Sequence, residues 1–224
     1  GAMATTAEVR RCTRLRGEPM RGRAAPERDS MSGTTNEGKE FMHYLSHYES
    51  PLGAMTMAGD GEHLTGLWFD GQKYDRSTID DDAVLQPRLP VFTQTAQWLD
   101  AYFEGADPGF TPPISIEGSD FRKMVTSIML SIPFGATSTY ARIAAEVARR
   151  TGRKQMSAQA VGGAVGRNPI VLIVPCHRVV GANGSLRGYA GGVDRKERLL
   201  EMEGVNMAGL PTPPTADDGG GTRE

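Results

Sequence analysis

The stretch Ile173–Val180, which reads IVPCHRVV, places a cysteine, a histidine and an arginine inside an apolar run. The apolar and β-branched residues on both sides predict that this segment is buried. Pro175 has no N–H group and a fixed φ, so it interrupts a strand ladder just before Cys176. We therefore expect the Cys176 thiol to be held on rigid backbone in an otherwise apolar part of the chain.

Cys176 is a candidate nucleophile if a base or a cation lies beside it, because the thiolate is the reactive form of cysteine. In a strand, His177 would point to the opposite face, so contact between imidazole and thiol would need a bend or a bridging water. A carboxylate such as Glu203 could hold the imidazole in the useful tautomer. The alternatives are an inert buried cysteine, which is common, and a zinc site, which would need further Cys or His ligands nearby in sequence.

The length and composition of the chain set broad limits on its class. Its 224 residues are enough for one large or two small domains. Residues 1–40 and 207–224 are poor in large apolar side chains, and we expect both to be disordered tails. We see neither a membrane-spanning run nor a signal peptide, and we expect a cytoplasmic protein without a membrane partner. A reducing compartment suits a working thiol, and we expect no bridge between Cys12 and Cys176.

Charge is distributed unevenly along the chain. Residues 42–118 carry 3 Lys or Arg and 12 Asp or Glu, for a net charge of −9, whereas residues 119–206 carry 13 and 6, for +7. This asymmetry indicates that only the second half approaches a polyanion such as nucleic acid. The alternative is ordinary solvated surface charge.

Residues 41–113 predict a small antiparallel meander followed by one helix. Short strands are expected at 42–48, 54–58 and 64–69, separated by turns that contain glycine. Apolar residues at helical spacing predict a helix over 90–103. The acidic run 80–82 is expected to be a solvated loop, because no further ligand-type residues have suitable spacing for a metal.

Residues 114–206 predict a second, mainly helical domain. Helices are expected at 120–132, 140–150 and 158–167, with caps at Ser119, at Ser138 or Thr139, and at Ser157. Helix, short connection, helix is the arrangement of helix-turn-helix DNA-binding proteins. Asn183–Gly184 predicts a tight hairpin turn, and a last helix is expected to be capped by Asp194.

The third of these helices is unusually smooth. Its sequence around residues 157–166 reads SAQAVGGAVG and carries almost no large side chain. Each glycine in a helix interior costs about 1 kcal/mol relative to alanine. We infer that another surface comes close to this backbone, either the narrow groove of a nucleic acid or a tightly packed neighbouring helix.

Residues 175–179, PCHRV, resemble the signature of the O6-alkylguanine-DNA alkyltransferases (methylated-DNA–protein-cysteine methyltransferases). The resemblance covers about residues 42–206 and is reinforced by Asn168–Pro169, by GYAGG at 188–192 and by the segment 196–203. It implies an α+β fold with an N-terminal ribonuclease H-like antiparallel sheet and helix. A C-terminal winged helix-turn-helix domain would follow.

The resemblance also implies a function, direct DNA repair. Cys176 would take an alkyl group irreversibly from O6 of guanine, or O4 of thymine, so that each molecule acts once and needs no cofactor. His177 would act on the thiol through a water, and Glu203 would orient His177. Asn168 would brace the site, and Tyr140 would donate its hydroxyl toward the base ring nitrogen or the flanking phosphate.

The implied partner is double-stranded DNA containing O6-alkylguanine, from which the damaged nucleotide is flipped. The protein would be a monomer in solution, with cooperativity along DNA left open. Gln159 stands where relatives usually have an arginine that replaces the flipped base. The expected base pocket comprises Val174, Val179, Tyr189, Ala190 and Gly191. The expected DNA contacts are Thr139, Arg153, Lys154, Gln159, Ala160, Gly162, Gly163 and Arg167. No metal is expected, because the Cys/His set of zinc-containing relatives is absent from the sequence.

The sequence leaves two other functions to consider. An alkyltransferase-like protein would bind lesions without chemistry, but such relatives replace the cysteine that is retained here as Cys176. A cysteine hydrolase would turn over an ester or amide, but the sequence shows no oxyanion-hole signature for it. Alkyl transfer is therefore the function that the sequence favours.

Overall fold

The computed structural model describes residues 42–209, all of which belong to one compact unit, Glu40–Glu224. The first tail expected to be disordered, residues 1–40, lies outside the described residues together with its Cys12. The second tail, 207–224, lies outside them after residue 209. Met207–Gly209 form a short 3-10 turn. No helix within residues 42–209 is both long enough and apolar enough to cross a membrane.

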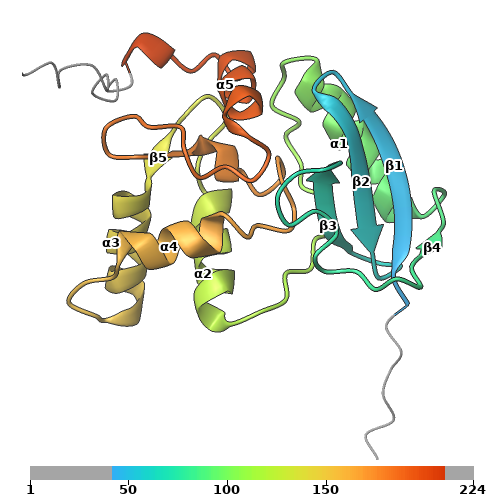
Figure 1. Cartoon of the computed structure of the whole chain (residues 1–224), viewed down its shortest axis with the longest axis horizontal. Coiled ribbons are helices and arrows are strands. Elements are labelled where there is room, and N and C mark those ends of the chain that lie inside the picture. The colour runs from blue at the N-terminus through green and yellow to red at the C-terminus, as the bar shows by residue number, and fades with distance from the viewer. Residues whose placement is uncertain (1–41, 210–224) are drawn as a thin grey trace, which may run out of the picture. The chain divides into compact units, whose positions relative to one another are not determined.

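The N-terminal part is a four-stranded sheet with the order β3-β2-β1-β4, packed against one helix (Figure 1). The strands β1 (Tyr44–Ser50), β2 (Gly53–Gly59) and β3 (Leu64–Phe69) form the predicted antiparallel meander. The helix α1 (Pro90–Phe103) matches its predicted limits. The sequence did not predict β4 (Val84–Leu85), which pairs in parallel with β1, because two exposed residues carry no periodic signal.

The C-terminal part is mainly helical, as predicted. Its first three helices are capped by the side chains of Ser119, Thr139 and Ser157, each of which accepts a hydrogen bond from a backbone N–H. Two short strands pair in parallel. The elements in chain order are α2 (Asp120–Leu130), β5 (Ser138–Thr139), α3 (Tyr140–Thr151), α4 (Ala158–Val165), the 3-10 helix η1 (Cys176–Arg178), β6 (Val179–Val180) and α5 (Val193–Met202).

Residues Cys176–Arg178 form a 3-10 turn, because Leu172 takes a left-handed φ of 69° and Pro175 a ψ of 63°, and both bend the chain. The sequence had left a bend open at this point. The predicted cap of the last helix is wrong. Asp194 does not cap α5; the capping position is Gly192, which has a φ of 92° and makes no side-chain cap.

The Asn183–Gly184 turn forms as expected and is closed by Gly181 N–H, which donates to the carbonyl of Ser185 at 2.8 Å. However, β6 pairs with β5 rather than forming a strand hairpin across this turn.

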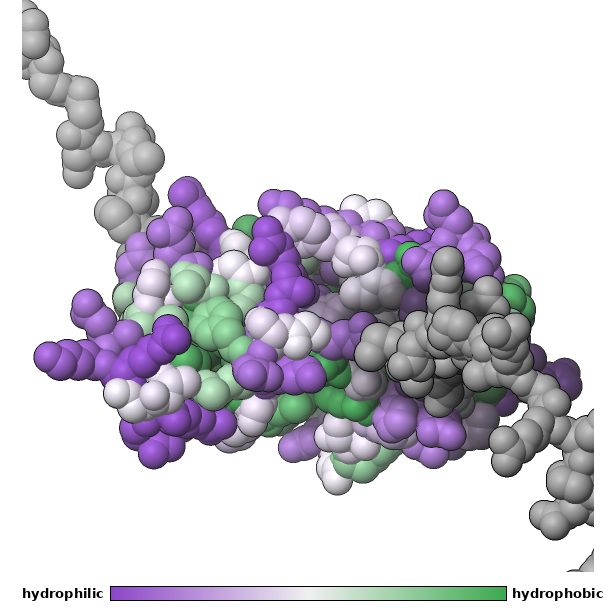
Figure 2. Space-filling view, turned by 90° about the horizontal axis from the view of Figure 1, so that it is seen from below, coloured by the Kyte–Doolittle hydropathy of each residue, from purple (hydrophilic) through white to green (hydrophobic). Residues whose placement is uncertain are grey.

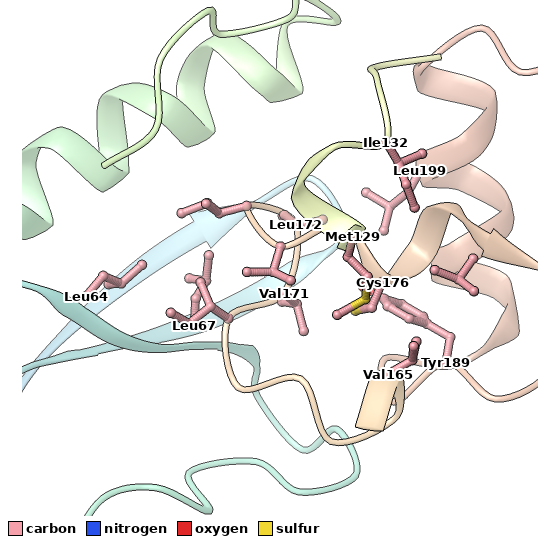
Figure 3. Close-up of a cluster of buried hydrophobic side chains, with 14 of the residues drawn as sticks. Leu64, Leu67, Met129, Ile132, Val165, Val171, Leu172, Cys176, Tyr189 and Leu199 are labelled. Carbon is pink, nitrogen blue, oxygen red and sulfur yellow. The ribbon is translucent and has the colours of Figure 1, made fainter. Parts of the chain in front are cut away.

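The free edge of β3 joins the two parts of the chain. The Leu67 N–H donates to the carbonyl of Pro169 at 2.8 Å, and the Val171 N–H donates to the carbonyl of Leu67 at 3.0 Å. Figure 3 shows the resulting cluster of buried side chains, which runs from Leu64 and Leu67 on the sheet through Val171 to Cys176. The segment that leads to the cysteine is therefore anchored on the sheet.

Packing within β3 gives a stability prediction. A Cβ on Gly66 would lie 1.9 Å from Cη2 of Trp68, whose ring is 1% exposed, because residues i and i+2 of a strand share one face. Gly66→Ala should lower the free energy of unfolding by about 1–3 kcal/mol. A Cβ on Gly163, in α4, would meet nothing within 4 Å. Gly163→Ala should therefore raise the free energy of unfolding by about 0.5–1 kcal/mol. Chemical denaturation of both variants checks this, and an unchanged midpoint for Gly66→Ala would contradict it.

Candidate active site

Cys176 opens the turn η1 and is almost fully buried, with 3% of its surface exposed. Its Sγ accepts a hydrogen bond at 3.0 Å from the side-chain amide of Asn168, which follows α4. The same amide nitrogen lies 2.8 Å from the carbonyl oxygen of Val174 and 3.1 Å from that of Ile170. Asn168 therefore ties the end of α4 to the segment that carries the thiol.

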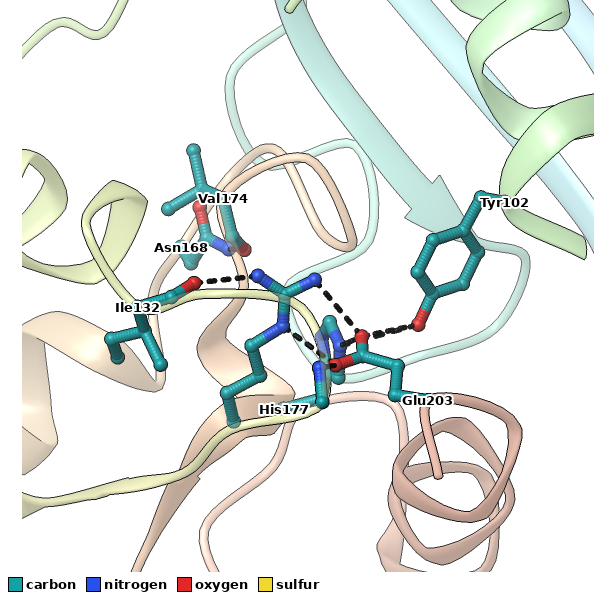
Figure 4. Close-up of polar contacts among 8 residues, drawn as sticks. Tyr102, Ile132, Asn168, Val174, His177 and Glu203 are labelled. Atoms are coloured by element: carbon teal, nitrogen blue, oxygen red, sulfur yellow. Dashed lines mark hydrogen bonds and ion pairs between the residues drawn. The ribbon is translucent and has the colours of Figure 1, made fainter. Parts of the chain in front are cut away.

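The imidazole of His177 and the carboxylate of Glu203, both fully buried, meet at 2.6 Å between Nε2 and Oε1 (Figure 4). Glu203 lies at the C-terminal end of α5, so this bond joins α5 to η1. Two further donors reach Oε1, the hydroxyl of Tyr102 at 2.8 Å and Nη2 of Arg178 at 3.1 Å. Oε2 accepts from Nε of Arg178 at 2.8 Å and from the Gly135 N–H at 3.1 Å.

Arg178 supplies the positive charge that balances Glu203. It is 8% exposed, and its Nη1 donates to the carbonyl of Ile132 at 2.7 Å. Its guanidinium also lies over the ring of Phe134, 5.7 Å from the centroid. A buried ion pair is tolerated when hydrogen bonds satisfy the remaining groups, and these contacts do so.

The contacts of Glu203 define the tautomer of His177. Because Nε2 faces a carboxylate oxygen at 2.6 Å, Nε2 must carry the proton and donate it. Nδ1 is then the unprotonated nitrogen; it is buried and has no hydrogen-bond partner among the described residues. No hydrogen bond joins the imidazole to the thiol within residues 42–209, so the basic nitrogen would reach Sγ through a water.

Burial keeps both reacting groups neutral at rest. Burial raises the pKa of the Cys176 thiol, although the hydrogen bond from Asn168 and the charge of Lys196 both act to lower it. Burial lowers the pKa of His177, although its hydrogen bond to Glu203 acts to raise it. Burial alone would also raise the pKa of Glu203, but hydrogen bonds from His177 and Arg178 outweigh it and lower this pKa to about 2. At neutral pH the site holds a thiol, a neutral imidazole and a carboxylate.

Lys196 is a second buried cation in the site. It is fully buried in α5, and its Nζ donates to the carbonyl of Val179 at 2.5 Å. Burial lowers its pKa to about 8, while the nearby Cys176 opposes this shift. Lys196 thus ties α5 to β6 and places a positive charge near the sulfur.

The loop that follows β6 faces α4 across a cavity. A cavity of about 290 Å³ is lined by Tyr189 and Ala190 from this loop, by Arg167 and three glycines of α4 and its end, and by Lys73 and Tyr74. Of the expected base pocket, only Tyr189 and Ala190 line this cavity, and Cys176 is not among its lining residues. Gly191, Val174 and Val179 do not line this cavity. The carbonyls of both valines already accept bonds from Asn168 and Lys196, respectively.

Tyr140, the first residue of α3, lies between α4 and this loop. Its hydroxyl donates to the carbonyl of Arg187 at 3.3 Å, and a Cβ on Gly188 would lie 3.0 Å from that hydroxyl. Burial raises the pKa of Tyr140, with a further contribution from Cys176. The structure thus brings Tyr140 beside α4 and the loop at Gly188.

The expected DNA contacts lie mainly on exposed surface. Gln159, Ala160, Gly163 and Arg167 are exposed on α4 or just after it, and Arg153 and Lys154 are exposed in the turn before it. Gly162 and Thr139 are half-buried. A hollow of about 390 Å³ between α2, α3 and α4 has a mainly apolar lining, and Figure 2 shows hydrophobic surface framed by hydrophilic side chains on this side.

The space around α4 decides between the two explanations of its glycines. A Cβ on Gly162 would make ordinary contact with Tyr140, at 3.8 Å, and a Cβ on Gly163 would meet nothing within 4 Å. Packing within the described part of the chain therefore does not require either glycine. The open backbone instead leaves room for an external surface.

Sequence reasoning missed three residues of the site. Arg178 lies inside the quoted motif, but we assigned it no role. Lys196 lies in a segment that supported the resemblance, and its burial is not visible in sequence. Tyr102 lies on the apolar face of α1, where an aromatic residue looks like any other core side chain.

Comparisons with known proteins agree with this arrangement. The ribonuclease-like domain of 6-O-methylguanine DNA methyltransferase matches residues 43–116, and the DNA binding domain of the same family matches residues 120–205. A methylated-DNA–protein-cysteine methyltransferase of Mycobacterium tuberculosis is 40% identical over 163 residues, covering 73% of this chain and 93% of the relative. One from Methanosarcina acetivorans is 42% identical over 162 residues, covering 72% and 98%.

A solved structure shows the same relationship. The crystal structure of Mycobacterium tuberculosis OGT in complex with DNA has a TM-score of 0.62 and 39% identity, over 71% of this chain and 92% of that chain. The two family domains together cover all residues of the site described above. This protein belongs to the 6-O-methylguanine DNA methyltransferase family.

Proposed function

We propose that this protein repairs DNA directly, by transferring the alkyl group of O6-alkylguanine, or of O4-alkylthymine, to Sγ of Cys176. The observation that supports this most strongly is the buried thiol held by Asn168, next to an imidazole that Glu203 fixes with Nδ1 unprotonated. The substrate is inferred from membership of the 6-O-methylguanine DNA methyltransferase family. The acceptor is consumed, so each molecule reacts once.

The chemical step is a displacement at carbon. The thiol proton passes through a water to Nδ1 of His177 while sulfur forms a bond to the alkyl carbon. The carbon–oxygen bond breaks and its electron pair goes to guanine, whose charge the Tyr140 hydroxyl stabilises by donating a hydrogen bond. The base then takes a proton from solvent, and the imidazolium of His177 returns its proton to solvent. The product is a thioether, which water does not hydrolyse under mild conditions, so the transfer is irreversible.

Access to the sulfur requires an unstacked base. Cys176 is 3% exposed, and a base inside a duplex cannot approach it, so the nucleotide must be flipped at a cost of a few kcal/mol. The cavity that Tyr189 and Ala190 share with α4 offers such a base a place beside the α4 surface, although Cys176 is not among its lining residues. The open backbone at Gly163 fits contact with the minor groove, which tolerates any sequence.

The substrate is double-stranded DNA carrying the lesion, bound by a monomer in the cytoplasm. The positive net charge of residues 119–206 and the exposed Arg153, Lys154 and Arg167 supply phosphate attraction that carries no sequence information.

Intact mass tests the proposed function. After incubation with duplex DNA carrying O6-methylguanine, the protein should gain one methyl group in place of the thiol hydrogen, and peptide mapping should place it on Cys176. Cys176→Ala should gain none. A wild-type protein that binds the lesion but stays unmodified would instead identify a lesion-binding protein without chemistry.

The protonation states predict the pH dependence of transfer. Because burial lowers the pKa of His177 from 6.5 and raises that of Cys176 from 9.0, both groups stay neutral around pH 7 to 8. The single-turnover rate constant should therefore change little around pH 7, where Lys196, with a pKa of about 8, is still charged. It should fall only at a pH below 6.5, because the lowered pKa of His177 places protonation of the imidazole there. A rate that rises tenfold per pH unit through neutrality would show that a free thiolate reacts instead.

A substitution at Gln159 should change the affinity for DNA. Gln159→Arg adds a charge on the exposed face of α4 and should strengthen binding to lesion duplexes, most clearly at low salt, with a steeper salt dependence. Gln94→Arg, on exposed surface of α1, is the matched control and should change little. Equal affinities for wild type and Gln159→Arg across a salt titration would refute this role for position 159.

A further inference from the structure

We infer that Tyr102 of α1 is a positioning residue for alkyl transfer, acting through Glu203 and His177. The inference rests on the proposed function and extends its site into the N-terminal part of the chain, within residues 43–116 of the ribonuclease-like domain. The family model for the DNA binding domain, which holds the cysteine, begins at residue 120.

The ring of Tyr102 is held in one orientation. It is 1% exposed and stacks on Trp98, with centroids 5.2 Å apart and planes 9° apart. Phe103 and Phe134 pack against it edge-on, at 5.5 and 6.1 Å. A ring fixed on several sides presents its hydroxyl at one place, and in Figure 4 that hydroxyl points at the Glu203 carboxylate.

The direction of this hydrogen bond follows from charge. The carboxylate of Glu203 is ionised at neutral pH and can only accept, so the tyrosine donates its proton to Oε1 at 2.8 Å. The tyrosine oxygen also lies 3.3 Å from Nε2 of His177, with its lone pairs free. Nε2–H therefore faces two acceptors, Oε1 and the tyrosine oxygen, which disfavours the tautomer that has its proton on Nδ1.

The hydroxyl has two consequences for the reaction. First, it fixes Oε1 and through it the plane of the imidazole, so that Nδ1 keeps one direction. Second, it withdraws part of the carboxylate charge that would otherwise stabilise the imidazolium form. Without it, Glu203 would favour protonated His177 more strongly, and the pKa of His177 would rise.

The test compares two tyrosines that each donate to a carboxylate at 2.8 Å. Tyr102→Phe removes the donor to Glu203, and Tyr48→Phe removes the donor to Asp100 on the exposed side of the same helix. Tyr102→Phe should slow single-turnover methyl transfer about tenfold, as loss of an orienting contact does. It should also move the acid limb of the pH–rate profile to higher pH. Tyr48→Phe should change neither property.

A second probe keeps the packing intact in case Tyr102→Phe folds poorly. 3-Fluorotyrosine at position 102 retains the ring and donates more strongly, so it should move the acid limb to lower pH. A merely structural tyrosine would shift unfolding but not the acid limb. The inference is overturned if both changes at position 102 leave the rate and the pH profile as in wild type.

The outcome separates this inference from the proposed function. If wild-type protein takes up a methyl group from lesion DNA and the changes at position 102 behave like wild type, only the role of Tyr102 fails. If wild-type protein takes up none, the proposed function fails. A titration of His177 followed by ¹⁵N NMR then makes the same comparison without DNA: the imidazole pKa should be higher in Tyr102→Phe than in wild type and unchanged in Tyr48→Phe.

Discussion

The buried carboxylate of Glu203 is the constraint on which the site depends. An ionised group in the interior is stable only if charge and hydrogen bonds replace its water. Here five donors do so, the hydroxyl of Tyr102, Nε2 of His177, two nitrogens of Arg178 and the N–H of Gly135. They come from α1, from the turn after α2 and from η1, while Glu203 itself ends α5. Satisfying one carboxylate thus fixes four segments relative to one another.

This arrangement holds a reactive atom in an unreactive state. Burial keeps both the thiol and the imidazole neutral, and the charged groups nearby are already paired or hydrogen-bonded. Because the thiolate is the form that oxidants attack, a neutral buried thiol is protected from side reactions. The carboxylate prepares the imidazole to accept a proton, and transfer begins only when a substrate carbon reaches the sulfur.

How much of this could be predicted depended on how local each signal is. The caps at Ser119, Thr139 and Ser157 and the limits of α1 follow from neighbouring residues, and the sequence predicted them. Cys176, His177, Asn168 and Glu203 came from a motif and its spacing. The sequence did not predict the 3-10 turn at Cys176–Arg178, because the β-branched neighbours favour a strand while the bend comes from Leu172 and Pro175. Tyr102 meets Glu203 across 101 residues, and no local pattern reports such a contact.

The most direct test of this account is the protonation state of His177 in the wild-type protein, measured by ¹⁵N NMR of the imidazole at pH 7. The account predicts a neutral ring with the proton on Nε2 and a bare Nδ1, next to an uncharged thiol. A doubly protonated ring beside a thiolate, or a neutral ring with its proton on Nδ1, would contradict it.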